Sequence, residues 1–339
     1  MFTEHTTSRL SLCRRVWTEW RKGGQIICHL KKHSAGAVIV NGYNDAARLR
    51  IIRWCRRHGI PCFLWADSNI RGDTTKGLKR LVKNVLVRSV VRSCTGLLPC
   101  GQLGQAYFQR YGGQRDRMFL LPLEADYDLI NGLRKDTIDQ VCSQYGLQLG
   151  RRRIVYSGRL VGLKRVDLLI DAFAAIAAQR PEWDLVLVGD GVLRQQLAAR
   201  VPAQLQGRVF WTGFLEDQAA ISAIYRASDV LALCSEYEAW ALVVIEAAAA
   251  GLALVCSDQV GAAPELLQDR RNGRLFPSGN LQALIESLLD VTAPDHIDAM
   301  KAATGAVLDD WRRRADPIQG LRQALRFCGV LPEHSPSTR

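Results

Sequence analysis

An apolar helix between two strand-like runs limits the possible folds of this chain more than any other feature. Residues 230–234 and 252–256 are short, continuous apolar runs, and the segment between them has apolar residues at helical spacing. Continuous apolar runs are typical of parallel strands that are covered on both faces of a sheet. A helix that joins two parallel strands is a crossover connection, so the sequence predicts an α/β protein.

Two carboxylates lie near the start of this crossover helix. Glu238 precedes the helix, which we expect to begin near Ala239, and Glu246 lies two turns within it. Open α/β sheets bind ligands at the carboxyl ends of their strands, where this helix begins. The alternative for Glu238 is an acid that interacts with the helix dipole. The alternative for Glu246 is a helix-face carboxylate paired with Lys or Arg, but an acid among apolar neighbours is costly to bury unpaired, which favours a functional role.

A second polar cluster lies upstream, after the strand-like residues 153–157. Gly158, Arg159, Gly162 and Lys164 form a loop that opens a new helix. A guanidinium binds phosphate oxygens through paired donors, an ammonium adds a point charge, and glycines allow close backbone approach. This loop therefore favours a diphosphate ligand, although two ordinary surface cations are the alternative.

Taken in order, these motifs resemble those of family 4 glycosyltransferases. The resemblance rests on Tyr-Ser-Gly-Arg-Leu-x-x-x-Lys from Tyr156, the Gly189-Asp190-Gly191 turn, the two glutamates, and Ser-Asp-Gln-Val-Gly from Ser257, and it spans roughly residues 36–290. It implies the GT-B fold, in which two Rossmann-like, doubly wound parallel-sheet domains face a cleft. It also implies transfer of a sugar from a nucleotide-sugar donor to an acceptor hydroxyl, usually with retention, without a metal and without a cofactor.

The resemblance assigns roles to individual residues. Glu246 is expected to accept hydrogen bonds from the donor ribose, and Glu238 to lie beside the transferring sugar. Arg159 and Lys164 are expected to bind the diphosphate and stabilise the leaving group, which makes them catalytic together with Glu238. The remaining donor-binding candidates contribute backbone amides, tight turns or contacts to the base: Gly158, Gly189, Gly213, Phe214, Trp240, Ala241 and Leu242. The family normally has glycine where Ala241 stands.

Gly189-Asp190-Gly191 also invites comparison with a dinucleotide-binding fingerprint. That fingerprint needs a third glycine for close helix packing, and Arg194 occupies its place. No acid stands near Trp211 to bind a ribose hydroxyl. A tight turn near the nucleotide is therefore the better interpretation.

In the first half of the chain, Asp67 and Asn44 follow two predicted strands and are acceptor-side candidates. Helix caps and turns are the alternative for both residue types. Relatives usually begin with a strand and a glycine-rich loop ahead of the region that matches Ala37. We therefore expect a shortened first domain whose sheet has an exposed edge.

We predict domain boundaries from the same alternation. Residues 1–135 form the incomplete, acceptor-side domain, 136–152 a connector, and 153–315 the nucleotide-sugar-binding domain. A helix at 316–330 is expected to pack back on the first domain, and residues 331–339 to form a flexible tail.

The formal net charge of +12 favours anionic partners. The segment that begins at Lys76 and ends at Cys94 alternates basic and apolar residues in helical rhythm, which indicates contact with an anionic membrane surface; a solvated cationic face is the alternative. The ten cysteines lack C-x-x-C spacing, and we expect reduced thiols in the cytoplasm, with the protein peripheral on the inner membrane face.

The predicted function is sugar transfer from a nucleotide-diphosphate sugar to a glycan, polysaccharide or lipid-linked acceptor. A catalytically inactive relative that serves as a binding or assembly subunit is one alternative, and a nucleotide-sugar epimerase of the same fold is another. Binding to nucleic acid is not expected, because charge alone suggests it and no recognition module is visible.

Overall fold

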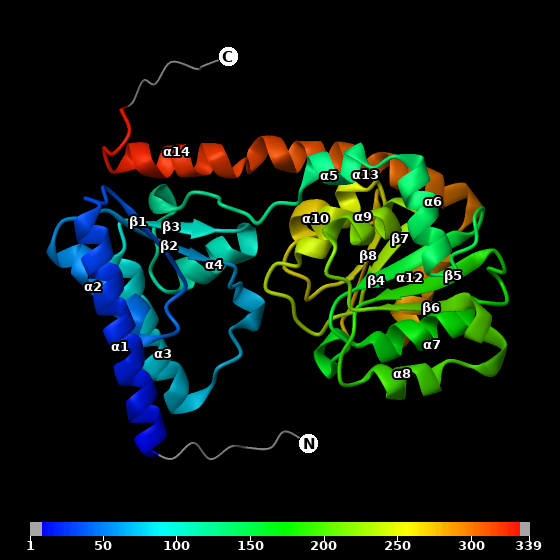
Figure 1. The fold of residues 1–339 in the computed structure, drawn as a ribbon, viewed down its shortest axis with the longest axis horizontal. Helices are drawn as coiled ribbons and strands as arrows, with labels where there is room; N and C mark the ends of the chain where they lie inside the picture. The colour runs from blue at the N-terminus through cyan, green and yellow to red at the C-terminus, as the bar shows by residue number, and fades with distance from the viewer. Residues whose placement is uncertain (1–8, 333–339) are drawn as a thin grey trace. The chain divides into compact units, whose positions relative to one another are not determined.

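The computed structural model describes residues 9–332, and internal contacts divide the chain into two units (Figure 1). The first unit comprises the residues up to Pro122 and those from Ala315, and the second is Leu123–Arg314. Among the described residues, no helix combines the length and apolar character needed to cross a membrane.

The first unit is built on a three-stranded parallel sheet with the order β1-β2-β3. Its strands are β1 (Val38–Asn41), β2 (Cys62–Ala66) and β3 (Gly96–Pro99). Its helices are α1 (Arg9–Lys32), α2 (Ala46–Arg57), α3 (Gly77–Ser93), α4 (Gln102–Arg110) and α14 (Pro317–Phe327).

The two faces of this sheet are covered by different parts of the chain. Helices α1 to α4 share one apolar core with the strands. On the other face, α14 packs over Phe63 and Leu98, and the rings of Phe119 and Phe327 lie 5.5 Å apart. A Cβ at Gly320 would overlap the backbone of Leu120, so only glycine lets α14 approach this closely.

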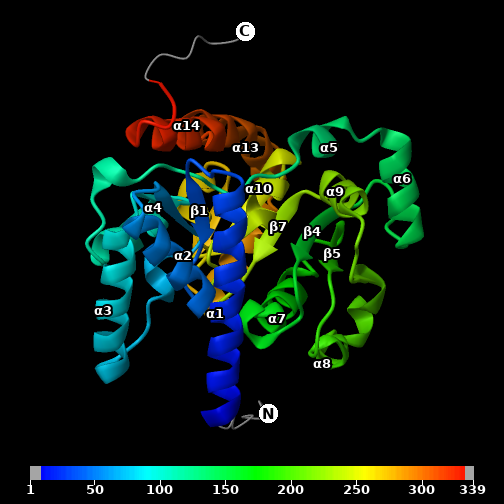
Figure 2. The same cartoon turned by 60° about the vertical axis from the view of Figure 1, so that its left-hand side comes forward.

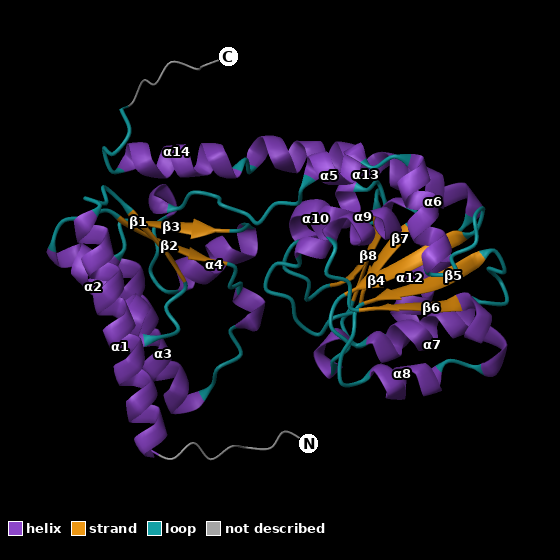
Figure 3. Cartoon of the chain, in the orientation of Figure 1, coloured by secondary structure: helices purple, strands orange, loops and turns teal. Residues whose placement is uncertain are grey.

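The second unit is built on a six-stranded, wholly parallel sheet (Figure 3). Its strands are β4 (Arg152–Ser157), β5 (Trp183–Val188), β6 (Val209–Gly213), β7 (Val230–Leu233), β8 (Ala253–Ser257) and β9 (Gly273–Phe276). They are arranged in the order β6-β5-β4-β7-β8-β9. The order reverses between β4 and β7, which is where a doubly wound sheet opens a crevice at its carboxyl ends. The predicted α/β class is confirmed.

Helices cover both faces of this sheet, with α7 and α8 on one side and α6 and α9 on the other (Figure 2). The helices of the unit are α5 (Tyr127–Gly132), α6 (Lys135–Gln144), α7 (Val166–Ile176), α8 (Arg194–Arg200), α9 (Gln218–Arg226), α10 (Leu242–Ala249), α11 (Ala263–Leu266), α12 (Leu281–Val291) and α13 (Pro294–Arg314). Both α5 and α6 contact α9. This division therefore begins the second unit at Leu123, whereas we placed the end of the first domain at 135 and the start of the next at 153.

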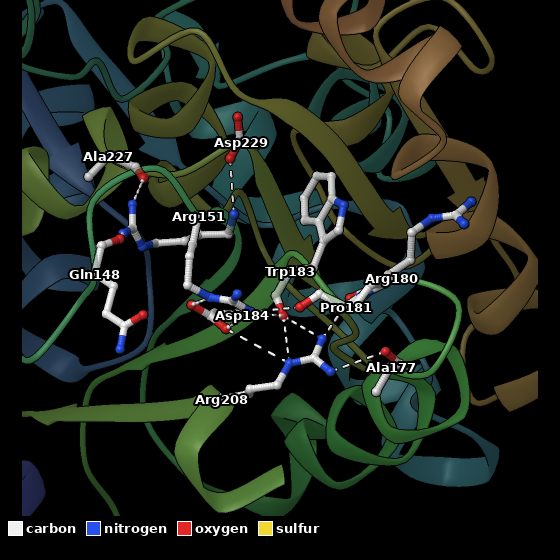
Figure 4. Close-up of polar contacts among 11 residues, drawn as sticks. Gln148, Arg151, Ala177, Arg180, Pro181, Trp183, Asp184, Arg208, Ala227 and Asp229 are labelled. Atoms are coloured by element: carbon white, nitrogen blue, oxygen red, sulfur yellow. Dashed lines mark hydrogen bonds and ion pairs between the residues drawn. The ribbon is translucent and has the colours of Figure 1, made fainter.

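An ion pair fixes the amino ends of β4 and β5, at the edge opposite the crevice (Figure 4). Asp184 is fully buried and accepts two hydrogen bonds of 2.7 Å from Arg151. Nearby, Arg208 donates to the carbonyl oxygens of Trp183 at 3.0 Å and Ala177 at 3.1 Å. Arg208 thus satisfies backbone acceptors at the end of α7 and the start of β5, so this edge stabilises the sheet.

Candidate functional site

Three glycines at the carboxyl ends of β4, β5 and β6 bring their loops together. Gly158, Gly189 and Gly213 all have positive φ, at 152°, 124° and 72°. A Cβ at Gly189 would overlap the carbonyl oxygen of Gly158, and the amide of Gly189 donates to Gly213 at 2.9 Å. The structure thus gathers all three predicted donor-binding glycines at one edge, in positions that favour glycine.

The loop after β5 is joined to the loop after β4 by backbone hydrogen bonds. The amide of Leu160 donates to Asp190 at 2.9 Å, and the amide of Leu193 donates to Leu160 at 3.1 Å. A Cβ at Gly191 would overlap the backbone of Leu160. Arg194 occupies the place of the fingerprint's third glycine, and it stacks on the Trp211 ring with its guanidinium carbon 4.2 Å from the ring centroid. Gly189-Asp190-Gly191 is therefore a tight turn held against its neighbour.

Lys164 and Glu238 meet across the point where the strand order reverses. Lys164 ends a 3₁₀ turn (Gly162–Lys164), and its Nζ donates to Oε1 of Glu238, 74 positions along the chain. The Ser235 hydroxyl, just past β7, donates to the same oxygen at 2.7 Å. Because both side chains of the ion pair are largely buried, this contact fixes the two loops to each other.

Arg159 is exposed and forms no ion pair with any described residue. Its carbonyl oxygen accepts a 2.9 Å hydrogen bond from the hydroxyl of Tyr156. The pKa of Tyr156 is raised mainly by burial and further by the Glu238 carboxylate, while the Arg159 guanidinium opposes the rise. Arg159 and Glu238 therefore both lie near Tyr156. The guanidinium of Arg159 remains available for an anion.

Glu246 is a buried carboxylate without a cationic partner among the residues that the structure describes. It is 8% exposed, and it accepts hydrogen bonds from Gln218 Nε2 at 3.0 Å and Tyr225 OH at 3.4 Å. Burial raises its pKa, and these two hydrogen bonds lower it in part. The alternative of a Lys or Arg pair is not found. Charge buried with so little compensation is typical of a functional site.

Glu246 and Ser157, the residue before the cationic loop, both interact with Tyr225. The pKa of Tyr225 is raised by burial and then by the Glu246 carboxylate, and the Ser157 hydroxyl lowers it. Ser157 ends β4, immediately before Gly158 and Arg159. One tyrosine therefore links the Glu246 carboxylate to the start of the loop that carries Arg159.

The segment before α10 differs from our expectation. The helix begins at Leu242 rather than near Ala239, because Ala241 has a left-handed conformation with φ 77° and ψ 78°. Trp240 is 3% exposed, its ring packs 5.8 Å from that of Trp311, and its carbonyl oxygen accepts a hydrogen bond from Ala262, so its side chain is not open to a ligand. No side chain caps α10, and the first amides of a helix lack acceptors within it.

Phe214 follows the strand end at Gly213 and is 72% exposed. An exposed ring next to the glycine loops has the surface that a nucleobase needs for stacking.

The two acceptor-side candidates lie in the first unit. Asp67 follows β2, Asn44 follows β1, and both are exposed. Their neighbours take the capping roles: the Asp45 side chain caps α2, and the Asn69 side chain caps the 3₁₀ turn Ile70–Gly72. Asn44 borders a cavity of about 400 Å³ beside Arg15 of α1.

Three polar residues of this site were not predicted. Ser235 was not predicted because a serine at a strand end is also typical of a turn. Its position three residues before Glu238 could have indicated a contact between the two side chains. Gln218 and Tyr225 lie on α9, and nothing in their local pattern indicates that α9 faces α10. Only the tertiary structure brings them to Glu246.

Residues 139–304 match the family model described as "Glycosyl transferases group 1". Among curated relatives, the putative glycosyltransferase EpsF of Bacillus subtilis (strain 168) is 28% identical over 225 residues, which are 65% of this chain and 57% of the relative. The D-inositol 3-phosphate glycosyltransferase of Segniliparus rotundus is 30% identical over 202 residues, 56% of this chain and 44% of that protein. The chain thus spans about half the length of these relatives.

Solved structures show the same fold. The Anabaena Alr3699/HepE complex with UDP aligns with a TM-score of 0.70 at 19% identity, over 91% of this chain and 82% of that one. A glycosyltransferase from Rickettsia africae ESF-5 aligns with a TM-score of 0.72 at 15% identity, over 98% and 84%. The predicted GT-B fold class is confirmed.

Proposed function

Because residues 139–304 match the glycosyl transferases group 1 model, we propose that this chain transfers a sugar from a nucleotide-diphosphate sugar to an acceptor hydroxyl. The observation that carries the proposal is the contact between Lys164 and Glu238 at the crevice of the six-stranded sheet. Arg159 contacts Tyr156 of the neighbouring strand β4 through its carbonyl oxygen, and Glu246 lies on α10, the helix that follows Glu238. The solved structures of Alr3699/HepE in complex with UDP and with UDP-glucose support a nucleotide-sugar donor.

In this proposal the donor nucleoside binds beside α10. The Glu246 carboxylate accepts hydrogen bonds from the ribose diol, which suits its oxygen acceptors. These added hydrogen bonds stabilise the buried charge. The glycine turns admit the diphosphate close to the backbone, and the first amides of α10 add donors at the positive end of the helix. Phe214 stacks on the base.

Catalysis then rests on charge placed before the reaction starts. The bond from the anomeric carbon to the phosphate oxygen breaks, and its electron pair stays on the departing diphosphate. Arg159 and Lys164 stabilise that growing negative charge in place of a metal ion. Glu238 holds Lys164 and positions the sugar. The acceptor hydroxyl oxygen bonds the anomeric carbon with retention of configuration, and its proton passes to the departing diphosphate oxygen.

The acceptor is the less constrained part of the proposal. We assign acceptor binding to the first unit, with Asp67 and Asn44 as candidates, and a glycan, polysaccharide or lipid-linked sugar as the acceptor class. An anionic membrane surface would bind near α3 and hold the protein on the cytoplasmic face. The charge of the first unit supports this: it has 25 Lys and Arg against 8 Asp and Glu, whereas the second has 20 against 25.

A thermal-shift screen against UDP, GDP, ADP and their sugars tests donor binding. One nucleoside diphosphate is expected to raise the melting temperature, since a ligand at 100 times its Kd stabilises the folded state by about 2.7 kcal/mol. Arg159→Glu is expected to abolish the shift. Arg115→Glu, an exposed charge reversal in the first unit, is the matched control and keeps it. The proposal fails if no nucleotide shifts the transition.

A transfer assay then separates an enzyme from a binding subunit. We expect release of the nucleoside diphosphate that depends on an acceptor and persists in excess EDTA. The comparisons give no support to the inactive alternative, yet tight donor binding without any transfer or hydrolysis would restore it. Donor conversion without an acceptor would instead indicate an epimerase.

A further inference from the structure

The first half of α3 presents apolar side chains to solvent. Their spacing of three and four residues puts them on one face of the helix. The exposed side chains are Leu78 (76%), Leu81 (61%), Val82 (63%) and Val85 (73%). The second half of α3 packs into the core through Val87, Val90 and Val91, which lie on the opposite face. We call the four exposed residues the α3 stripe.

This arrangement differs from a helix that rests on a membrane by a basic face. Lys83 turns inward and pairs with Asp73 at 2.8 Å. Lys79, Arg88 and Arg92 remain exposed on the sides of α3 that flank the stripe, and Arg80 is exposed on the opposite side. An apolar stripe bordered by cations is the pattern of a helix that lies in a membrane interface.

A groove of about 560 Å³ continues from the α3 stripe between α1, α2 and α3. Leu86, one turn beyond Val82, lines the groove and connects it to the stripe. The remaining lining is apolar or can donate hydrogen bonds, and it contains no carboxylate: Trp20, Leu49, Ile52, Arg53, Arg56, Arg57, Ser89, Val90 and Ser93.

Three arginines form the polar side of the groove. Arg53, Arg56 and Arg57 lie three and four positions apart, on one face of α2, and all three are exposed. None pairs with an acid among the described residues, and Arg56 donates to the Ser93 hydroxyl at 3.2 Å. Cations suit the last turn of a helix, but three adjacent guanidinium groups repel one another unless an anion joins them. Guanidinium groups bind phosphate through paired donors.

Tryptophans flank this surface on α1. Trp17 is 59% and Trp20 44% exposed, with Arg21 and Arg50 stacked on their rings at 4.8 Å each. Figures 1 and 2 show the first turns of α1 and α3 extending in the same direction from the three-stranded sheet. Trp is enriched at membrane interfaces, where its ring is amphipathic.

We infer that the groove binds the phosphate headgroup of an anionic lipid at Arg53, Arg56 and Arg57 while the α3 stripe and Trp17 insert into the same bilayer. The inference deepens the membrane part of the proposed function and rests on it. The occupant follows from charge: an unpaired cationic groove without carboxylates, in a unit with 25 basic and 8 acidic residues, is complementary to an anionic surface.

Vesicle flotation of the full chain tests the inference. We expect binding to phosphatidylcholine vesicles that contain phosphatidylglycerol, and little binding to pure phosphatidylcholine. Arg53→Gln/Arg56→Gln/Arg57→Gln is expected to weaken binding at least tenfold. Lys31→Gln/Lys32→Gln/Arg115→Gln removes the same charge from exposed positions outside the groove and is expected to weaken binding less than threefold. Equal losses in the two triple variants would overturn the inference.

A second pair of measurements separates the other occupants. Leu81→Ser/Val85→Ser is expected to reduce flotation about tenfold and to leave the molecular mass in solution unchanged. A halved mass in this variant, with no flotation of the parent chain, would show a stripe that joins two copies and would overturn the inference. A thermal shift with glycerol 3-phosphate but no vesicle binding would show a site for a free phosphate and would also overturn it.

Binding of nucleoside diphosphate is measured on the same samples. This control shows that the second unit of each variant is folded, because the nucleotide site lies there, and an unchanged melting temperature shows that the first unit is folded as well. Loss of flotation with intact nucleotide binding and an unchanged melting temperature concerns the groove alone. If the parent chain binds vesicles but no nucleoside diphosphate, the proposed sugar transfer is wrong and the inference about the groove stands.

Discussion

Lys164 donates a hydrogen bond to the carboxylate of Glu238, and this contact joins the loops that follow β4 and β7. The two strands are neighbours at the point where the order of the sheet reverses. A cation and an acid from distant parts of the sequence are thereby fixed at the crevice before any ligand binds, which is what electrostatic preorganisation requires.

The two cations are expected to respond differently to mutation. Arg159→Gln should weaken binding of the preferred nucleoside diphosphate at least tenfold with no change in melting temperature, because the side chain is exposed and unpaired. Lys164→Met should weaken binding similarly and also destabilise the fold by about 1–3 kcal/mol, since it removes a largely buried ion pair with Glu238. Calorimetric titration and urea unfolding measure the two effects. Equal stability losses would contradict the assigned geometry.

Glu246→Gln is expected to lower nucleotide affinity while it stabilises the protein at neutral pH. The substitution removes the cost of burying a charge with only Gln218 and Tyr225 as partners. It also removes one acceptor for the ribose diol. Differential scanning fluorimetry with and without nucleotide gives both values. A variant that binds nucleotide more tightly would count against the ribose role. A variant that is less stable at pH 8 would count against a cost for burying this charge.

The raised pKa of Glu246 also predicts a pH dependence of stability. The folded state holds this proton more tightly than the unfolded state, so the group favours folding at low pH. That contribution is present below the unfolded pKa of about 4.3 and is lost as pH rises through the folded pKa. The stability gain of Glu246→Gln should therefore grow with rising pH above about 4.3, as measured by urea unfolding in a pH series. A gain independent of pH would mean that burial does not raise this pKa.

Ala241→Gly is expected to stabilise the protein by about 1 kcal/mol. Ala241 has φ 77°, where a Cβ costs about 1–2 kcal/mol, and glycine avoids this strain. Greater freedom of glycine in the unfolded chain offsets part of the gain. Ala241→Val, in contrast, should destabilise the fold, because a β-branched residue is least tolerant of this conformation. Chemical unfolding of the three proteins gives the order, and a destabilised glycine variant would rule out strain.

Asp184→Asn is expected to reduce stability by about 3 kcal/mol without changing nucleotide affinity. Asp184 is fully buried and joined to Arg151 at the amino ends of the strands, away from the crevice (Figure 4). Thermal unfolding and nucleotide titration test the two parts. Asp171→Asn, which breaks a more exposed pair with Arg200, is the control and should cost less than 1 kcal/mol.

The strands could be predicted because each is a short apolar run. The strand predicted at residues 252–256 corresponds to β8 (Ala253–Ser257), and the strand predicted at 230–234 corresponds to β7 (Val230–Leu233). The start of α10 was wrong by three residues, because the left-handed Ala241 interrupts a sequence that favours helix from Ala239 onward. The predicted end of the first domain at 135 also differs from the division at Leu123. The packing of α5 and α6 against α9 cannot be recognised from the composition of these helices.

The sequence by itself determined the α/β class, the parallel strands, the loops on which Arg159, Lys164 and Glu238 lie, and the helix that carries Glu246. Periodicity and glycine positions are local properties, and a parallel strand sends every following loop to the same edge. Only the tertiary structure decided which groups meet: Lys164 with Glu238, Gln218 and Tyr225 with Glu246, and the three arginines of α2 with the groove beside α3. Those contacts depend on strand order and helix packing, which bring together residues that no local pattern connects.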